Sequence, residues 1–200
     1  MKKINILLIF YILLTSFKII KKNNIDYDNY LILVNKNNKI KSDYYPNDLV
    51  LIDLPKARDI YIRKIVLDNY TNLYNDALLI GYKFIAFSGF RDIDYQKDIY
   101  LNSYDKYVAY PGYSEHHTGL ALDISISNVG LSTYFEGYEE YNWLSNNSYK
   151  YGFILRYPKD KTDITLYPFE PWHYRYVGIK HSTYIYENNL TLEEYLEIIN

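Results

Sequence analysis

The sequence predicts an α+β domain in which helices pack around a small antiparallel sheet. Segments with the period of strands and segments with the period of helices are mixed along the 200 residues, without the regular alternation of β–α–β units. Parallel sheets are built from such units, so an antiparallel sheet is expected. Apolar residues make up 48% of the chain, which is enough for one domain with a hydrophobic core.

Residues 119–126 give the clearest strand. Leucine and isoleucine alternate there with a second set, Ala121, Asp123 and Ser125, so one face is apolar and Asp123 lies on the other. Short apolar runs predict the remaining strands or extended segments, which are 31–34, 48–54, 84–87 and 172–177.

Four helices are expected. Between residues 60 and 80, apolar side chains recur every three or four positions, and Gly81 is placed to end that helix. A second helix begins at Asp94, which is a suitable N-cap. The other two are the segment 139–149 and a helix that starts at Thr191, where a glutamate three residues later completes a capping box.

Residues 1–23 are interpreted as a secretory signal peptide or an uncleaved membrane anchor. Lys2 and Lys3 precede the apolar run 4–17, an order typical of both. The run is shorter than the ~20 residues that span a bilayer, which favours a signal peptide, whereas the lack of a small-residue cleavage site favours an anchor. Both readings place the folded domain, residues 24–200, on the outer side of the membrane. The alternative is a buried helix of a cytosolic domain.

The composition excludes a nucleic acid partner and every kind of site that needs cysteine. A net charge of −2 leaves no basic surplus to neutralise phosphates, so no nucleic acid partner is expected. The absence of cysteine excludes disulfides, a thiolate metal site, a cysteine nucleophile and a lipoprotein anchor. Any metal ligands must therefore come from Asp, Glu and the four histidines.

Three segments carry the candidate chemistry: 88–91 (SGFR), 114–123 (SEHHTGLALD) and 170–173 (EPWH). Asp123 lies within an otherwise hydrophobic strand, where a carboxylate is costly unless it is paired or bound to a metal. Two imidazoles, one carboxylate and an open position for water are typical of catalytic zinc. Each segment alone is also consistent with a purely structural role, as a hydrogen-bonded His–carboxylate pair or as a surface arginine in a salt bridge.

Hydrolysis of an amide at such a zinc also needs a base and a cation for the developing oxyanion. Glu170 is the candidate base, although residues three apart on a regular strand face opposite ways. Pro171 indicates a bend that turns Glu170 inward. Arg91 is the candidate cation.

In this order the three segments resemble the motifs of the VanY-type D,D-carboxypeptidases and the related L,D-carboxypeptidases, which are zinc metallopeptidases. The pattern S-x-H-x-x-G-x-A-x-D is complete, and E-P-W-H follows at 170–173. The resemblance covers about residues 31–178, includes 150–158 (KYGFILRYP), and has its core motifs within 84–178. It implies an α+β fold with an antiparallel sheet and a zinc site like that of the hedgehog signalling domain.

The resemblance also implies residue roles. One zinc would be bound by His116, Asp123 and His173, with Glu170 as the base and Arg91 stabilising the tetrahedral intermediate. The positions that contact the terminal D-Ala of the substrate in relatives correspond here to Gln96, Ser114 and Tyr157. His117 occupies a variable motif position and is assigned to the surroundings of the site or to the surface, and His181 is assigned a structural role.

The implied function is removal of the last D-Ala from a peptidoglycan stem pentapeptide. Three alternatives stay open: an L,D-carboxypeptidase acting on the tetrapeptide, an endopeptidase that cuts within the stem, and a non-catalytic, zinc-stabilised binding module. A purely structural zinc site has no use for Glu170 and Arg91, which argues against the last. The expected protein is a monomer, anchored in the cell membrane with its catalytic domain outside, or secreted to the cell wall.

Overall fold

The computed structural model describes residues 29–103 and 107–200. The predicted signal or anchor segment, residues 1–23, lies outside these residues. Within them, no helix is long and apolar enough to cross a bilayer. Residues 32–200 form one compact unit, and of the preceding unit only a short 3-10 helix, η1 (Asn29–Leu31), is described.

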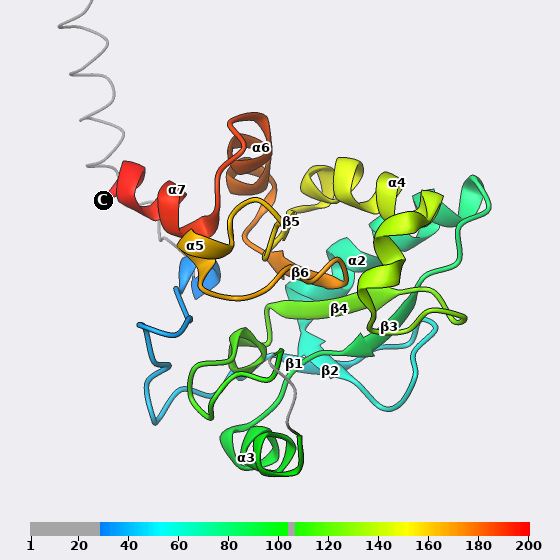
Figure 1. Cartoon of the computed structure of the whole chain (residues 1–200). Coiled ribbons are helices and arrows are strands. Elements are labelled where there is room, and N and C mark those ends of the chain that lie inside the picture. Colours follow the sequence, from blue (N-terminus) through cyan, green and yellow to red (C-terminus); the bar gives the residue numbers. More distant parts are fainter. Residues whose placement is uncertain (1–28, 104–106) are drawn as a thin grey trace, which may run out of the picture. The chain divides into compact units, whose positions relative to one another are not determined.

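The centre of the fold is a four-stranded antiparallel sheet, as predicted. Its spatial order is β3 (Ile85–Ser88), β4 (Ala121–Ser125), β6 (His173–Tyr176) and β5 (Phe153–Leu155) (Figure 1). The last strand in the chain, β6, is thus inserted between β4 and β5. This insertion pairs Asp123 with His173 across the β4–β6 ladder. On the other edge of β4, Asp123 is paired with Ser88 of β3.

A second, two-stranded sheet corrects the prediction for residues 60–80. β1 (Leu49–Leu51) pairs with β2 (Tyr61–Arg63), and only then does α2 (Lys64–Leu79) begin. The apolar spacing is real, but its first members belong to a strand because their backbone pairs with residues 49–52. Gly81, with φ +93°, follows the end of α2 as expected.

The remaining helices agree with the sequence in position but not always in their ends. α3 (Ile93–Asn102) is capped by Asp92, whose carboxylate accepts a hydrogen bond from the Tyr95 N–H at 2.7 Å, and not by Asp94. The predicted helix 139–149 is divided between an α-helix and a 3-10 helix. The other helical segments are η2 (Glu115–Thr118), η3 (Thr133–Gly137), α4 (Glu139–Asn147), η4 (Ser148–Tyr151), α5 (Thr162–Thr165), α6 (Ile179–Glu187) and α7 (Leu192–Ile199).

Two further outcomes concern the ends of the domain. The capping box at the start of α7 is confirmed, with both reciprocal hydrogen bonds between Thr191 and Glu194 present. The apolar run 31–34 does not form a strand; Val34 is fully buried, but no neighbouring strand pairs with this segment. In the compact unit, α6 lies beside β5, and α3 lies on the side of β3 (Figure 1).

Strand β4 lies deeper than its alternating pattern predicts. All five of its residues are buried, so the face that carries Asp123 is covered by protein as fully as the apolar face. The carboxylate of Asp123 therefore lies in the interior, where its partners decide its charge state.

Candidate metal centre and active site

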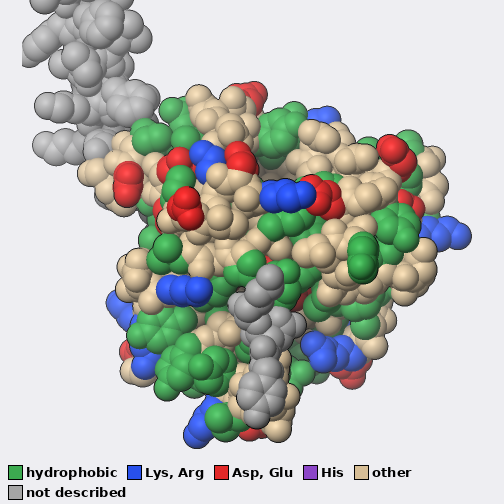
Figure 2. Space-filling view, viewed as in Figure 1, with side chains coloured by type: hydrophobic (Ala, Val, Ile, Leu, Met, Phe, Trp, Pro, Cys, Tyr) green, Lys and Arg blue, Asp and Glu red, His purple; other side chains and the backbone are tan. Residues whose placement is uncertain are grey.

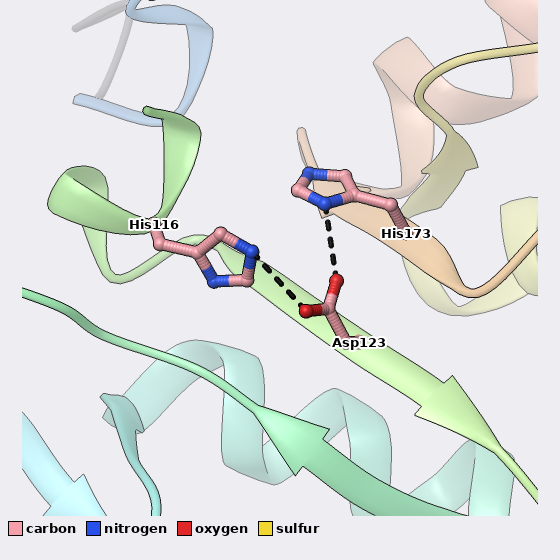
Figure 3. Close-up of side chains that lie close together, drawn as sticks. All are labelled: His116, Asp123 and His173. Carbon is pink, nitrogen blue, oxygen red and sulfur yellow. Dashed lines mark ion pairs between the residues drawn. The ribbon is translucent and has the colours of Figure 1, made fainter. Parts of the chain in front are cut away.

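Three predicted ligands come together in the structure. His116 lies in η2, Asp123 in the middle of β4 and His173 at the start of β6 (Figure 3). Asp123 Oδ2 is 3.4 Å from His116 Nε2, and Asp123 Oδ1 is 3.1 Å from His173 Nδ1. One ligand atom from each residue lies within 4.8 Å of the others, and all three residues are buried. This spacing suits a single metal ion.

Local sequence explains how His116 reaches Asp123. The Ser114 hydroxyl caps η2 by accepting a hydrogen bond from the His116 N–H at 3.3 Å. Gly119 then ends η2 in the left-handed region, at φ +67°, which glycine adopts without strain. This turn sends the chain directly into β4, so the ligand on the 3-10 helix and the ligand on the strand face each other.

A hydrogen bond to the backbone orients the His116 imidazole toward Asp123. His116 Nδ1 donates to the Gly89 carbonyl at 2.6 Å, which leaves the lone pair of Nε2 facing Asp123. Asp123 Oδ1 is buried and accepts no hydrogen bond within the described residues. A buried carboxylate oxygen without a donor is costly, and a cation at this point removes that cost. The donor set of two imidazoles and one carboxylate fits zinc.

Charge states support the same conclusion. Burial would raise the pKa of the Asp123 carboxyl, but His116 and His173 hold it well below its ordinary value, so Asp123 is ionised. Burial lowers the pKa of His116 to about 4, so this imidazole is neutral and ready to coordinate. Burial also favours neutral His173, but the Asp123 and Glu115 carboxylates beside the ring raise its pKa to about 9. A metal ion displaces that proton when it binds.

Glu170 is turned inward by the bend that Pro171 predicts. The chain makes a turn in which the His173 N–H donates to the Glu170 carbonyl at 3.1 Å. As a result Glu170 Oε2 lies 3.5 Å from His173 Nδ1, on the metal side of the ring, although the two residues are three apart. Glu170 is buried. Its carboxylate thus lies beside the three predicted ligands, and its role as the base stays a prediction.

Arg91 lies on the wall of the same cavity. It forms no ion pair with any residue that the structure describes, and its Nε has no hydrogen-bond partner there. Burial lowers the pKa of its guanidinium, and the charges of Asp123 and Glu170 oppose that shift. Arg91 is thus an inward-facing cation rather than a surface arginine in a salt bridge.

The cavity has a volume of about 460 Å³ and opens over the three ligands. Ser114 and Tyr157, two predicted substrate contacts, line it, and the Tyr157 ring packs on His173 with centroids 4.8 Å apart. Gln96 does not line it. It is fully buried behind the wall, and its amide donates to the Ala109 carbonyl at 2.7 Å. Its direct contact with substrate stays a prediction.

The other two histidines have structural partners. His117 Nδ1 donates to the Arg91 carbonyl at 2.7 Å and its Nε2 accepts from the Gly112 N–H at 3.0 Å, so neither nitrogen is left for a metal. His117 is buried and braces the segment that carries Arg91. His181 pairs with the Tyr195 hydroxyl at 2.5 Å, between α6 and α7.

One functional candidate was missed by the sequence reasoning. Glu115, between Ser114 and His116, is buried with its carboxylate against two fully buried arginines, Arg156 and Arg175. An acidic residue inside a metal-binding motif was the available signal, but its partners lie 41 and 60 residues away.

Comparison with known proteins identifies the family. The family model described as VanY, D-alanyl-D-alanine carboxypeptidase, matches residues 59–179. The chain belongs to this family. The predicted family, the α+β fold class and the class of enzyme, a zinc metallopeptidase with one metal ion, are thereby confirmed.

Two curated relatives illustrate the match. A putative carboxypeptidase YodJ of Bacillus subtilis (strain 168) is 45% identical over 185 residues, covering 85% of this chain and 68% of the relative. A D-alanyl-D-alanine carboxypeptidase of Enterococcus faecium is 36% identical over 183 residues, covering 86% of this chain and 59% of the relative. The chain thus spans about three fifths to two thirds of the length of these relatives.

Solved structures of VanY-family and related enzymes share the fold. The LdcB LD-carboxypeptidase has a TM-score of 0.80 and 44% identity, covering 86% of this chain and 88% of that one. A mutant of the vancomycin-resistance D,D-pentapeptidase VanY, solved with Zn(II), has a TM-score of 0.70 and 38% identity, covering 84% and 99%.

Proposed function

We propose that this VanY-family protein is a zinc-dependent D,D-carboxypeptidase that removes the C-terminal D-Ala from peptidoglycan stem peptides. The observation that carries the proposal is the buried cluster of His116, Asp123 and His173 at the base of a cavity whose wall holds Glu170 and Arg91. A D-alanyl-D-alanine carboxypeptidase of Enterococcus faecium and a VanYB structure with D-alanine-D-alanine name the substrate of relatives.

His116, Asp123 and His173 would hold the zinc, which when bound would lower the pKa of a water and polarise the scissile carbonyl. Glu170 accepts the proton of the attacking water, whose oxygen bonds to the carbonyl carbon. Arg91 stabilises the negative charge that develops on the carbonyl oxygen. The C–N bond then breaks, and Glu170 returns the proton to the departing amine of D-Ala. Water is consumed, and the shortened stem and free D-Ala leave.

The cavity wall suits a small C-terminal residue. Ser114 offers a hydroxyl beside the ligands, and Tyr157 packs against the ring of His173. We assign these two residues to contacts with the terminal D-Ala. Gln96 donates to the Ala109 carbonyl of the wall, and its own contact with the substrate stays a prediction. Figure 2 shows acidic and basic side chains interspersed over one face of the molecule, without a continuous basic tract on that face.

A second candidate is supported by the neighbours themselves. LdcB is named an LD-carboxypeptidase, and DacB from Streptococcus pneumoniae is described as an L,D-carboxypeptidase. Both activities release D-Ala by the same chemistry, and they differ in the configuration of the residue before the scissile bond. The tetrapeptide is therefore the alternative substrate.

The substrate lies outside the cytoplasm, and we place the enzyme there. Membrane association through residues 1–23 and a monomeric state belong to the proposal as predicted from the sequence.

The test measures zinc and D-Ala together. The purified chain is expected to contain one zinc and to release D-Ala from a synthetic pentapeptide stem, with a tetrapeptide as the parallel substrate. Glu170→Gln should keep the metal and lose roughly 10²–10⁴-fold in kcat, the usual contribution of a general base. Glu136→Gln, which removes an exposed carboxylate paired with Lys159, is the matched control and should keep full activity. Full activity in Glu170→Gln would refute the assigned mechanism.

A further inference from the structure

Glu115 is a buried carboxylate that the proposed mechanism does not use. It is 1% exposed, and its Oε1 accepts hydrogen bonds from Arg156 Nε and Arg175 Nη1, both at 2.7 Å. Its second oxygen, Oε2, has no hydrogen bond within the described residues. Burying a charge costs several kcal/mol, and a carboxylate that served only to neutralise arginines would gain most by using both oxygens in paired contacts.

The second carboxylate oxygen of Glu115 faces His173, one of the proposed zinc ligands. Glu115 Oε2 is 3.6 Å from His173 Nε2, and this nitrogen likewise has no hydrogen-bond partner among the described residues. The other ring nitrogen, Nδ1, lies on the metal side, 3.1 Å from Asp123 Oδ1. The imidazole of His173 is therefore placed between a carboxylate behind it and the metal site in front.

His116 has the same arrangement with a different partner. Its nitrogen away from the metal side donates to the Gly89 carbonyl at 2.6 Å. Each imidazole of the centre thus has one oxygen acceptor behind it, a backbone carbonyl for His116 and a carboxylate for His173. Such outer partners choose the tautomer and the ring orientation of a histidine ligand and raise its basicity.

We propose that Glu115 is a positioning residue of the metal centre: its carboxylate accepts the Nε2 proton of His173 and thereby directs the Nδ1 lone pair to the zinc. The inference rests on the zinc site of the proposed function and adds a residue to it. The guanidiniums of Arg156 and Arg175, both 2.7 Å from Oε1, stabilise the carboxylate form of Glu115 that this role requires.

The two arginines also prevent the carboxylate from turning away. Both are fully buried. Arg156 binds Glu193 of α7 through Nη1 at 2.8 Å and Nη2 at 2.6 Å, and Arg175 Nη2 donates to the Ile32 carbonyl at 2.8 Å. The guanidiniums are thus held from the far side by the last helix and by the segment that precedes β1. Glu115 is consequently held rigidly behind His173.

The experiment compares two glutamates that share Arg156. Glu115→Gln and Glu193→Gln each remove one carboxylate from that arginine, but only Glu115 faces His173. Zinc affinity of the full chain is measured by competition with a chromogenic chelator at fixed pH, and the stability of each metal-free variant is measured by urea unfolding. Glu115→Gln should weaken zinc binding by about 10–100-fold, whereas Glu193→Gln should stay within about threefold of the unmodified protein. Both variants should unfold at a lower urea concentration than the unmodified protein.

The possible results separate the roles. Unchanged zinc affinity in Glu115→Gln, or equal weakening in both variants, would show that Glu115 serves only the fold and would overturn the inference. If Glu115→Gln does not fold, Glu115→Asp keeps the charge for the arginines but shortens the reach to His173, and it should show the same loss of zinc affinity. A wild-type chain that binds no zinc would refute the proposed function as well as this inference, whereas zinc-bound wild type with an unaffected Glu115→Gln refutes the inference alone.

Discussion

Gly89→Ala is expected to disturb both the core and the metal centre. A Cβ at residue 89 would lie 2.6 Å from Ile60 Cγ2, 2.6 Å from the Tyr61 carbonyl oxygen and 2.8 Å from Ile62 Cγ2. Ordinary contact begins at 3.4 Å, so the neighbours must retreat by about 0.8 Å, the difference between 3.4 and 2.6 Å. The isoleucines are buried, and the Tyr61 carbonyl accepts a hydrogen bond from the Phe90 N–H at 2.7 Å.

The size of the effect follows from this crowding. Overpacking of a core costs about 1–3 kcal/mol, and for a protein of this length each kcal/mol lowers Tm by about 2–4 °C. The expected fall in Tm is therefore about 2–12 °C. Because the Gly89 carbonyl is the acceptor for His116 Nδ1, displacement of this segment should also weaken zinc binding, by up to about 10–100-fold.

The assay is differential scanning calorimetry together with zinc competition. Gly137→Ala is the matched control, because its added Cβ meets nothing within 4 Å and its φ is not in the left-handed region. That variant should change stability by less than about 0.5 kcal/mol. A Gly89→Ala protein with the Tm and zinc affinity of the control would refute the reasoning from close packing.

Two further predictions concern metal removal and pH. Removing zinc with EDTA should lower Tm, because a ligand present at 1,000 times its Kd stabilises the folded state by about 4 kcal/mol, and added zinc should restore it; an unchanged Tm in calorimetry would contradict this. Burial, with a smaller contribution from Lys180, lowers the pKa of His181, so below its ordinary value of 6.5 the unfolded chain binds a proton that the folded chain does not. The stability that wild type has relative to His181→Gln should be constant above pH 7 and fall as the pH drops below 6.5, by at most about 1.4 kcal/mol per pH unit in urea unfolding. Parallel pH profiles for the two proteins would contradict the role given to this histidine.

The sequence correctly predicted features that depend only on residues a few positions apart in the chain. The capping box at Thr191 depends on residues three apart, and the turn at Pro171 depends on the fixed φ of proline; both are present. The prediction of Asp94 as the cap of α3 was wrong. Asp92 also suits a cap by residue type, and its extended backbone conformation places the start of the helix after it.

Where the local pattern was ambiguous, the presence or absence of pairing with another strand decided the secondary structure. Residues 60–63 continue the apolar spacing of α2, but pairing with β1 makes them a strand and an entry to the helix. The run 31–34 has the composition of a strand, but a strand also needs a neighbour with a free edge. Neither outcome can be read from a window of a few residues.

The sequence by itself determined the chemistry of the metal site. With no cysteine and four histidines, a carboxylate within a hydrophobic strand and an EPWH turn left few donor sets, and His116, Asp123 and His173 do meet in space. Only the tertiary structure decided what stands behind these ligands. Glu115 reaches His173 because β6 is inserted between β4 and β5, and Glu115 is held by Arg156, which directly follows β5, and by Arg175 in β6. The metal ligands could be predicted because their residue types occur within short sequence motifs. The residues that contact these ligands depend on the order of strands in the sheet, which no local pattern encodes.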